Sequence, residues 1–152
     1  MEEISLRPLT IENWEDAIHL HVRKDQKHFV ASNVYSIAEA HFNPELTPMG
    51  IYAGEKMVGF LMTGLERGRD RWWLMRLMID ERHQGKGYGR EALRQVIGLM
   101  RQTPGCDRIY LSYEPQNITA EMLYKSFGFR ATGEMEDGEK VVVLEDFSGI
   151  DV

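Results

Sequence analysis

Alternating glycines make residues 82–89, Arg-His-Gln-Gly-Lys-Gly-Tyr-Gly, the part of this sequence best suited to bind an anion. The stretch follows an apolar run at residues 72–79 and leads into a helical pattern at residues 90–101. Glycines leave the backbone unobstructed, so consecutive N–H groups can turn toward one ligand. A helix that begins there adds its unpaired first-turn amides and the positive end of its dipole. The stretch therefore predicts a site for phosphate or pyrophosphate.

Other interpretations of these glycines stay open. Gly87-x-Gly89-x-x-Ala92 matches the dinucleotide-binding fingerprint, and Asp107 follows about twenty residues later. Two features disfavour a dinucleotide site: the glycines follow a charged loop, residues 80–86, and the chain is short for a cofactor domain plus a substrate domain. The absence of Gly-x-x-x-x-Gly-Lys-Ser/Thr disfavours a P-loop, and a turn without any ligand is the plain structural alternative.

Alternating and helical hydrophobic patterns predict elements in the order β-α-α-β-β-β-α-β-α-β-β. Strands are expected at residues 4–9, 49–53, 56–65, 71–80, 108–113, 129–135 and 140–147. Helices are expected from Thr10 through His21, from a capping box at Ser36 to about Phe42, at residues 90–101, and from Asn117 or Thr119 to Gly128. Turns are expected at Gly54-Glu55, at residues 68–70 and at Asp137-Gly138.

These elements predict a single α/β domain over residues 1–152, with a mixed, mostly antiparallel sheet flanked by helices. The strand–helix–strand unit at residues 71–113 is a crossover that joins parallel strands. Its first strand is apolar on both alternating faces, as a central buried strand should be. Arg76 is the interior charge of that strand and is expected to pair with an acid.

Composition and charge restrict the class of protein. The chain has 152 residues, of which 43% are hydrophobic and 28% charged, and its net charge is -6. The negative charge argues against nucleic acid and anionic membrane as partners and suits a cationic small substrate, although an acidic surface also serves solubility alone. The single cysteine, the lack of a signal peptide and the lack of a membrane-spanning run favour a cytoplasmic protein. The histidines show no metal-ligand spacing, so no metal site is expected.

Two motifs resemble those of the GNAT superfamily of N-acetyltransferases. Arg82-x-x-Gly85-x-Gly87, after a strand and opening a helix, is similar to the acyl-CoA pyrophosphate signature of that superfamily. The second superfamily motif is resembled by Asn117-x-x-Ala120-x-x-Leu123-Tyr124-x-x-x-Gly128-Phe129. The resemblance implies an enzyme that transfers an acetyl group from acetyl-CoA to a primary amine. A different amine acceptor, such as a protein N-terminus or an aminoglycoside, and a non-catalytic acyl-CoA-binding module are the alternatives.

A narrower resemblance, to bacterial spermine/spermidine (diamine) acetyltransferases, covers most of the chain. It rests on the stretches Gln26-x-x-Phe29-Val30-Ala31-x-Asn33, Ser36-x-Ala38-Glu39-Ala40, Val58-Gly59-Phe60, Met78-Ile79-Asp80 and Gln84-Gly85-Lys86-Gly87-Tyr88-Gly89. This resemblance implies a polyamine such as spermidine or spermine as the acceptor. The sequence leaves open whether a homodimer completes the amine site.

The resemblance also implies roles for single residues. Leu77, Met78 and Ile79 would bind the pantetheine arm through their backbone, and the amides of Gln84, Gly85, Lys86, Gly87, Tyr88 and Gly89 would bind the pyrophosphate. Asn117 would contact the cofactor, and Tyr124 would protonate the departing sulfur as general acid. Core packing is the alternative for Tyr124 when it is considered without the motif. Phe29, Asn33 and Ser36 lie where the resemblance places a wall of the substrate site.

The general base is where this sequence departs from the superfamily pattern. Many members place a Glu on the strand before the glycine loop, but residues 72–79 contain no acid. An alkylamine with a pKa of about 10.4 is mostly protonated at pH 7, and its deprotonation costs roughly 4–5 kcal/mol, so a base or a desolvating site is needed. We expect Glu114, just after the next strand, to act as base or amine anchor. The alternative for Glu114 is a solvated loop carboxylate.

Overall fold

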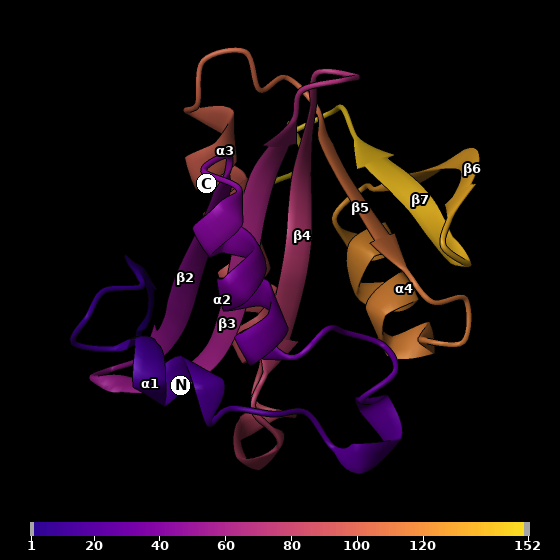
Figure 1. Ribbon diagram of the computed structural model, residues 1–152. Coiled ribbons are helices and arrows are strands. Elements are labelled where there is room, and N and C mark those ends of the chain that lie inside the picture. The colour runs from indigo at the N-terminus through magenta and orange to yellow at the C-terminus, as the bar shows by residue number, and fades with distance from the viewer. Residues whose placement is uncertain (1, 151–152) are drawn as a thin grey trace.

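The computed structural model describes residues 2–150 (Figure 1). The strands are β1 (Ile4–Pro8), β2 (Leu46–Ala53), β3 (Lys56–Glu66), β4 (Arg71–Ile79), β5 (Ile109–Tyr113), β6 (Arg130–Glu136) and β7 (Glu139–Leu144). The α-helices are α1 (Trp14–Ile18), α2 (Asn33–Phe42), α3 (Tyr88–Arg101) and α4 (Ile118–Ser126), and the 3-10 helices are η1 (Lys24–Gln26) and η2 (Glu81–His83). The predicted order of strands and α-helices is confirmed.

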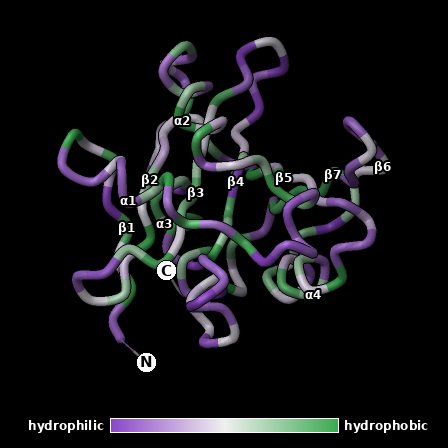
Figure 2. The backbone as a smooth tube through the Cα atoms, turned by 60° about the horizontal axis from the view of Figure 1, so that its bottom comes forward, coloured by the Kyte–Doolittle hydropathy of each residue, from purple (hydrophilic) through white to green (hydrophobic). Residues whose placement is uncertain are grey.

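One sheet of seven strands, in the order β1-β2-β3-β4-β5-β7-β6, forms the centre of the fold. Neighbouring strands are antiparallel, except that β4 and β5 are parallel across the α3 crossover. The mixed, mostly antiparallel α/β sheet predicted from the sequence is therefore confirmed. Figure 2 shows the more hydrophobic backbone segments gathered among the sheet strands and the hydrophilic ones in the connecting loops.

Both faces of the sheet are covered, which explains why β3 is apolar on both sides. Val58 and Leu61 belong to the core cluster that includes α3 residues, whereas Phe60 and Met62 belong to the cluster that includes α1 residues. Gly59 lies between them because a Cβ there would come within 2.5 Å of the Met78 carbonyl oxygen on β4. Neither face of this strand is free to bind a ligand.

The N-terminal helices differ from their predicted bounds. α1 ends at Ile18, so His21 lies outside the helix that the apolar spacing predicted. α2 begins at Asn33 because the Ser32 hydroxyl accepts a hydrogen bond from the Tyr35 amide at 3.1 Å. The capping box predicted at Ser36 is wrong, since Ser36 is buried inside the helix. The N-cap of α2 is Ser32, four residues before the predicted cap.

The predicted tight turns are confirmed. Asp137 and Gly138 both have positive φ, at 50° and 81°, as the turn between β6 and β7 requires. Gly54 has φ 59° in the turn between β2 and β3. Asn117 caps α4 by accepting a hydrogen bond from the Ala120 amide at 3.2 Å, so the first of the two predicted caps is the correct one.

The parallel strands β4 and β5 separate along their length. They share one register pair, Trp73 with Tyr110, close to the start of both strands. Beyond that pair the strands diverge, as Figure 1 shows between β4 and the orange β5. β4 also carries an extra residue, Met75, because Met62 and Thr63 of β3 pair with Arg76 and Leu74. The separation leaves backbone groups of β4 without a strand partner on the β5 side.

Candidate active site

The gap between β4 and β5 opens into a cleft of about 1320 Å³. Its walls come from β4 and β5, from the glycine loop with the start of α3, from α4, from the segment between α1 and α2, and from the β6–β7 hairpin. Segments far apart in the sequence therefore meet around one space where the sheet is interrupted. A long, flexible ligand could lie between the strands and take the place of the missing strand pairing.

The edge of β4 offers alternate backbone groups to the cleft. The Asp80 amide donates to the Val58 carbonyl on β3 at 2.8 Å, so the polar groups of Met78, two residues earlier, also face β3. Those of Leu77 and Ile79 face the gap instead. All three residues line the cleft, but the strand geometry favours Leu77 and Ile79 as the backbone contacts for a ligand.

The glycine loop presents its amides at the wide end of the gap. Gly85 and Gly87 have φ of 78° and 84°, in the left-handed region that suits glycine, and Gly87 is the N-cap of α3. α3 therefore begins at Tyr88, two residues before the predicted start, and its first amides belong to the loop. This geometry fits an anionic group, as expected from the sequence.

Asp80 anchors the glycine loop through Arg82. It is fully buried, and its carboxylate accepts hydrogen bonds from the Arg82 side chain at 2.8 Å and from the backbone amides of His21 and Arg82. Burial by itself raises the pKa of Asp80, but these hydrogen bonds and the charge of Arg82 outweigh it, so the pKa lies below its usual value. The ionised carboxylate thereby links β4, the loop and the end of the α1 region.

Gln84 connects the loop to the segment between α1 and α2. Its side-chain amide donates to the Ile79 carbonyl and to the Gln26 side chain, both at 3.0 Å, and accepts from Arg23 at 3.1 Å. Lys86, by contrast, is exposed and does not line the cleft. Within residues 84–89, Lys86 could thus contribute through its backbone amide alone in this arrangement.

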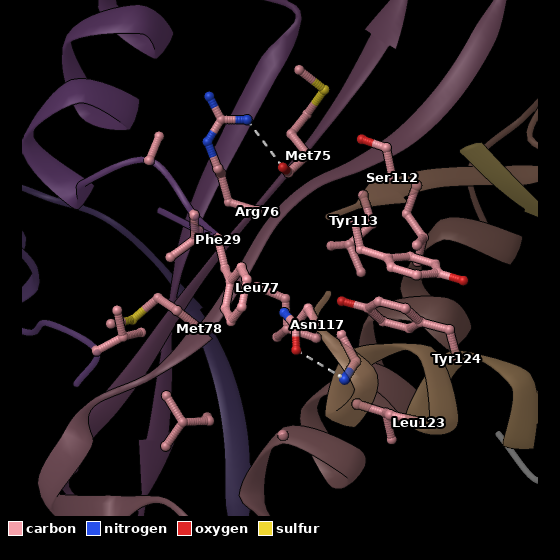
Figure 3. Close-up of a pocket in the computed structure, with 18 of the residues that line it drawn as sticks. Phe29, Met75, Arg76, Leu77, Met78, Ser112, Tyr113, Asn117, Leu123 and Tyr124 are labelled. Atoms are coloured by element: carbon pink, nitrogen blue, oxygen red, sulfur yellow. Dashed lines mark hydrogen bonds between the residues drawn. The ribbon is translucent and has the colours of Figure 1, made fainter. Parts of the chain in front are cut away.

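Tyr124 approaches the gap from α4. Figure 3 shows its hydroxyl directed toward Leu77 on β4, while the hydroxyl of the neighbouring Tyr113 points away from the cleft. Its ring packs against Tyr113 and Phe129, each at 5.8 Å between ring centroids. Burial, followed by the charges of Glu139 and Tyr113, raises the pKa of Tyr124 to about 12. The phenol is therefore protonated at neutral pH and can donate a proton into the gap.

Charged side chains are segregated along the cleft. The loop end, formed by residues 83–90 and α4, has no carboxylate among the described residues that line it. The part of the lining outside the loop and α4, which we call the acidic end, carries the five carboxylates of Glu39, Glu66, Glu136, Asp137 and Glu139. An anion is thus favoured at one end and a cation at the other. Residues 2–150 contain no group of side chains that could hold a metal ion and no helix suited to cross a membrane.

Comparison with known protein families identifies the family to which this chain belongs. The model of the acetyltransferase (GNAT) family matches residues 9–129. The chain belongs to the GNAT family of acetyltransferases. It is therefore an acetyl-CoA-dependent N-acetyltransferase, and the family, the enzyme class and the cosubstrate expected from the sequence are confirmed.

Individual relatives of this GNAT enzyme cover nearly the whole chain. A spermine/spermidine N(1)-acetyltransferase of Bacillus subtilis is 37% identical over 149 residues, which cover 93% of this chain and 98% of the relative. Among solved structures, spermidine N-acetyltransferase from Vibrio cholerae in complex with CoA and spermine is similar with a TM-score of 0.73 and 16% identity, over 92% of both chains. An aminoglycoside acetyltransferase in complex with coenzyme A has a TM-score of 0.76 and 18% identity, over 94% of this chain and 95% of that chain. At these identities the two structural likenesses show the fold alone.

Several residues expected at the substrate site of the GNAT enzyme lie elsewhere. Phe29 lines the cleft, but Asn33 and Ser36 are buried in the first turn of α2, where Asn33 donates to the Ala17 carbonyl at 2.9 Å. Glu114 lies between β5 and α4 and is not among the residues that line the cleft. Its role as base stays a prediction. Arg76 pairs with Glu39 at 3.1 Å, which confirms the expected ion pair.

A hydrogen-bonded pair of polar residues in the GNAT cleft was not predicted. Ser112 on β5 donates to the Glu139 carboxylate on β7 at 2.6 Å, and both residues line the acidic side of the gap. Their contact depends on the register between β5 and β7, which pairs Ser112 with Val141. No local pattern in the sequence fixes that register, because the two strands are separated by α4 and β6.

Proposed function

We propose that this GNAT enzyme acetylates a primary amine of a polyamine such as spermidine or spermine, by direct attack in a ternary complex. The observation that carries the proposal is the charge segregation of the cleft: five carboxylates line the acidic end and none lines the loop end among the described residues. A polyamine is a flexible polycation at neutral pH, so it is attracted to the acidic end. The identity of 37% to a spermine/spermidine acetyltransferase supports the same acceptor class.

The chain supplies cofactor binding, a proton donor and a proton acceptor in this reaction. The amides of residues 84–89 would bind the pyrophosphate, with Asn117 as a further contact, and the backbone of Leu77 and Ile79, with Met78 beside them, would align the pantetheine arm. After the ammonium has lost one proton to solvent, the amine nitrogen attacks the thioester carbonyl carbon, so that a C–N bond forms as the C–S bond breaks. Tyr124 then donates its proton to the departing sulfur, and the surplus proton of the nitrogen passes to a base. Glu114 and the carboxylates of the acidic end are the candidates for that base.

A panel of acceptors tests the proposed function. Thiol release from acetyl-CoA is measured with spermidine, spermine, putrescine, a peptide N-terminus and an aminoglycoside. We expect rapid turnover with the polyamines and background rates with the other two acceptors. Faster turnover with the peptide or the aminoglycoside would overturn the polyamine assignment while leaving the acetyltransferase class intact.

Direct attack has its own test. The enzyme is mixed with radiolabelled acetyl-CoA without an amine, quenched in acid and examined for label on the protein. We expect no acetylated residue. A labelled residue that passes its acetyl group to spermidine at the turnover rate would replace the ternary-complex mechanism by a covalent one.

The remaining partners stay predictions. A net charge of -6 leads us to expect no nucleic-acid partner and, with the composition, a cytoplasmic location. Homodimer formation is tested by light scattering on a size-exclusion column, at enzyme concentrations spanning those of the kinetic assay. A monomer at all concentrations with full activity would show that one chain completes the amine site.

A further inference from the structure

The missing acid of β4 leaves the proton of the amine without an assigned acceptor. β4 reads Arg-Trp-Trp-Leu-Met-Arg-Leu-Met-Ile, and its charged residue beside the gap, Arg76, is a cation. A protonated alkylamine must lose a proton at a cost of roughly 4–5 kcal/mol at pH 7 before or during attack. A carboxylate elsewhere in the cleft has to take over this role, and the inference that follows rests on the proposed transfer to an amine.

Three of the five carboxylates at the acidic end are already paired with arginines. Glu39 pairs with Arg76 at 3.1 Å, and Glu66 and Glu136 both pair with Arg69. A paired carboxylate has a cation that competes with any incoming ammonium, so its attraction for the substrate is reduced. The unpaired carboxylates are the ones that project a net negative charge into the cleft.

Asp137 and Glu139 have no cationic partner in residues 2–150. Asp137 occupies the β6–β7 turn, where its φ is 50° and its side chain is exposed. Glu139 lies at the start of β7 and is partly buried. A partly buried carboxylate interacts more strongly with an amine than an exposed one, because less water screens the charge.

Glu139 is held in place by Ser112. The Ser112 hydroxyl donates to a Glu139 carboxylate oxygen at 2.6 Å. Ser112 pairs with Val141 across the strands, and residues 139 and 141 lie on the same face of β7, so the contact follows from the register. The hydrogen bond occupies one oxygen and leaves the other free for an N–H group.

Glu139 and Tyr124 line the same cleft from opposite faces of the sheet. Tyr124 reaches the gap from α4, and Figure 3 shows Ser112 on the far side of that gap from α4, its hydroxyl directed toward the side of Met75. Glu139 and Tyr124 both line the cleft, and the charge of Glu139 contributes to the raised pKa of Tyr124. A thioester between β4 and β5 would thus have a proton donor on one side and a proton acceptor on the other.

We infer that Glu139 binds the reacting amine and accepts its proton as the C–N bond forms, and that Ser112 is the positioning residue for Glu139. The bound ammonium first gives one proton to the free Glu139 oxygen, which passes it to solvent and leaves the nitrogen with a lone pair. The neutral nitrogen then bonds to the carbonyl carbon, and a second N–H proton moves to the same Glu139 oxygen. The electron pair of the breaking C–S bond leaves with sulfur, which takes the Tyr124 proton. Transfer of the second proton from Glu139 to Tyr124 restores both groups, so protons and electrons balance.

Three variants test this inference in the whole chain: Glu139→Gln, Glu139→Asp and Ser112→Ala. We expect Glu139→Gln to lower kcat with spermidine about 100-fold at pH 7, since general base catalysis contributes about that much or more. Glu139→Asp should recover at least a tenth of the wild-type kcat, and Ser112→Ala should lower kcat less than Glu139→Gln does. The KM for acetyl-CoA and the rise in Tm caused by CoA should stay within twofold of wild type, which shows that the fold and the cofactor end are intact.

Glu134→Gln is the matched control, because Glu134 lies on β6 of the same hairpin but does not line the cleft. Its kcat should stay within twofold of wild type. Because the amine itself loses its proton as the pH rises, the deficit of Glu139→Gln should narrow at pH 9. The charged and titratable side chains on the neighbouring elements are Tyr110, Tyr113, Glu121, Tyr124, Lys125, Glu134, Glu136, Asp137 and Lys140. A catalytic deficit that is equal at pH 7 and pH 9 would reduce Glu139 to a structural role.

A base other than Glu139 would overturn the inference. If Glu139→Gln keeps its rate within twofold while Glu114→Gln loses most of its turnover at pH 7, the base is Glu114. If wild-type enzyme fails to acetylate spermidine but acetylates another amine of the panel, the proposed acceptor is wrong, and the same variants are measured with that amine. The two failures are therefore distinguishable in one set of assays.

Discussion

Tyr124 and Tyr113 form a natural pair for testing the proton donor. Their rings are 5.8 Å apart, and Figure 3 shows that the Tyr124 hydroxyl is the one directed into the gap. Tyr113 donates its hydroxyl hydrogen to Glu121 at 3.0 Å instead. We predict that Tyr124→Phe lowers kcat about 100-fold because the sulfur loses its proton donor, as expected for a general acid. Steady-state kinetics measures this, and Tyr113→Phe should retain at least a third of wild-type kcat.

The raised pKa of Tyr124 also predicts how the stability of the fold depends on pH. Its folded-state pKa of about 12 lies above the unfolded value of about 10. The neutral phenol therefore stabilises the fold fully below pH 10, and this stabilisation is lost as the pH rises through 12. An alkaline loss of kcat below pH 9 that disappears in Tyr124→Phe would contradict the assignment of this pKa.

Asp80 is predicted to be a stability residue of the glycine loop. Replacement by Asn removes the charge that holds Arg82 and the amides of His21 and Arg82, and should lower the free energy of unfolding by about 1–3 kcal/mol. Urea unfolding at pH 7 measures the change, with the exposed Asp25→Asn as a control expected to cost less than about 0.5 kcal/mol. The folded-state pKa of Asp80 is lowered, so its stabilisation is present above the unfolded pKa of about 3.9 and is lost as the pH falls through the folded value. A difference between the two proteins that grows below pH 4 would argue against this role.

The sequence predicts single residues well where one motif contains the whole contact. Asn117 caps its own helix three residues later, which follows from local spacing. The glycines of Arg82-x-x-Gly85-x-Gly87 also predict the helix that follows them, although α3 begins two residues before the predicted start. Glu139 was missed because its partner Ser112 is 27 residues away, on a strand whose register depends on the packed sheet. For the same reason the sequence pointed to Glu114 as the base. Glu114 directly follows Tyr113 in the sequence but does not line the cleft.

At the scale of the elements, the glycine loop permits a controlled substitution. Gly85 and Gly105 have φ of 78° and 87°, and a Cβ at either would meet no atom within 4 Å. Alanine at either position should therefore cost a similar free energy of folding, roughly 1–2 kcal/mol. Gly85 lines the cleft and Gly105 does not. We predict that Gly85→Ala raises the KM for acetyl-CoA about tenfold, while Gly105→Ala leaves it within twofold. Equal KM values for both variants would remove the loop from the cofactor site.

Element types were easier to predict than element ends. The hairpins around Gly54 and Asp137-Gly138 were predicted because positive φ demands particular residues. The start of α2 was wrong because Ser32 and Ser36 are both acceptable caps in sequence, and packing of α2 against the sheet selects the first. The five-residue length of α1 has a similar cause: tertiary contacts, including the Asn33 bond to the Ala17 carbonyl, end the helix before its apolar pattern does.

For the whole molecule, the cleft makes stability depend on the cofactor. β4 and β5 share one register pair, so a ligand between them contacts both halves of the sheet. We predict that CoA at 100 times its Kd stabilises the enzyme by about 2.7 kcal/mol, which corresponds to a Tm increase of about 5–10 °C for a chain of this size. Differential scanning fluorimetry measures the shift. NAD at the same concentration should leave the Tm unchanged, and a larger shift with NAD would favour the dinucleotide interpretation.

The glycine loop has a consequence for flux through the enzyme. The amides of residues 84–89 would bind the pyrophosphate, and the β4 edge would bind the pantetheine arm. Acetyl-CoA and free CoA both contain these two groups. The acetyl group that distinguishes the two lies beyond these contacts. Affinity from shared parts favours product as strongly as substrate, so free CoA occupies the cleft in competition with acetyl-CoA. The turnover rate then depends on the ratio of acetyl-CoA to free CoA. The enzyme slows when this ratio falls, even while the total concentration of acetyl-CoA plus CoA is constant.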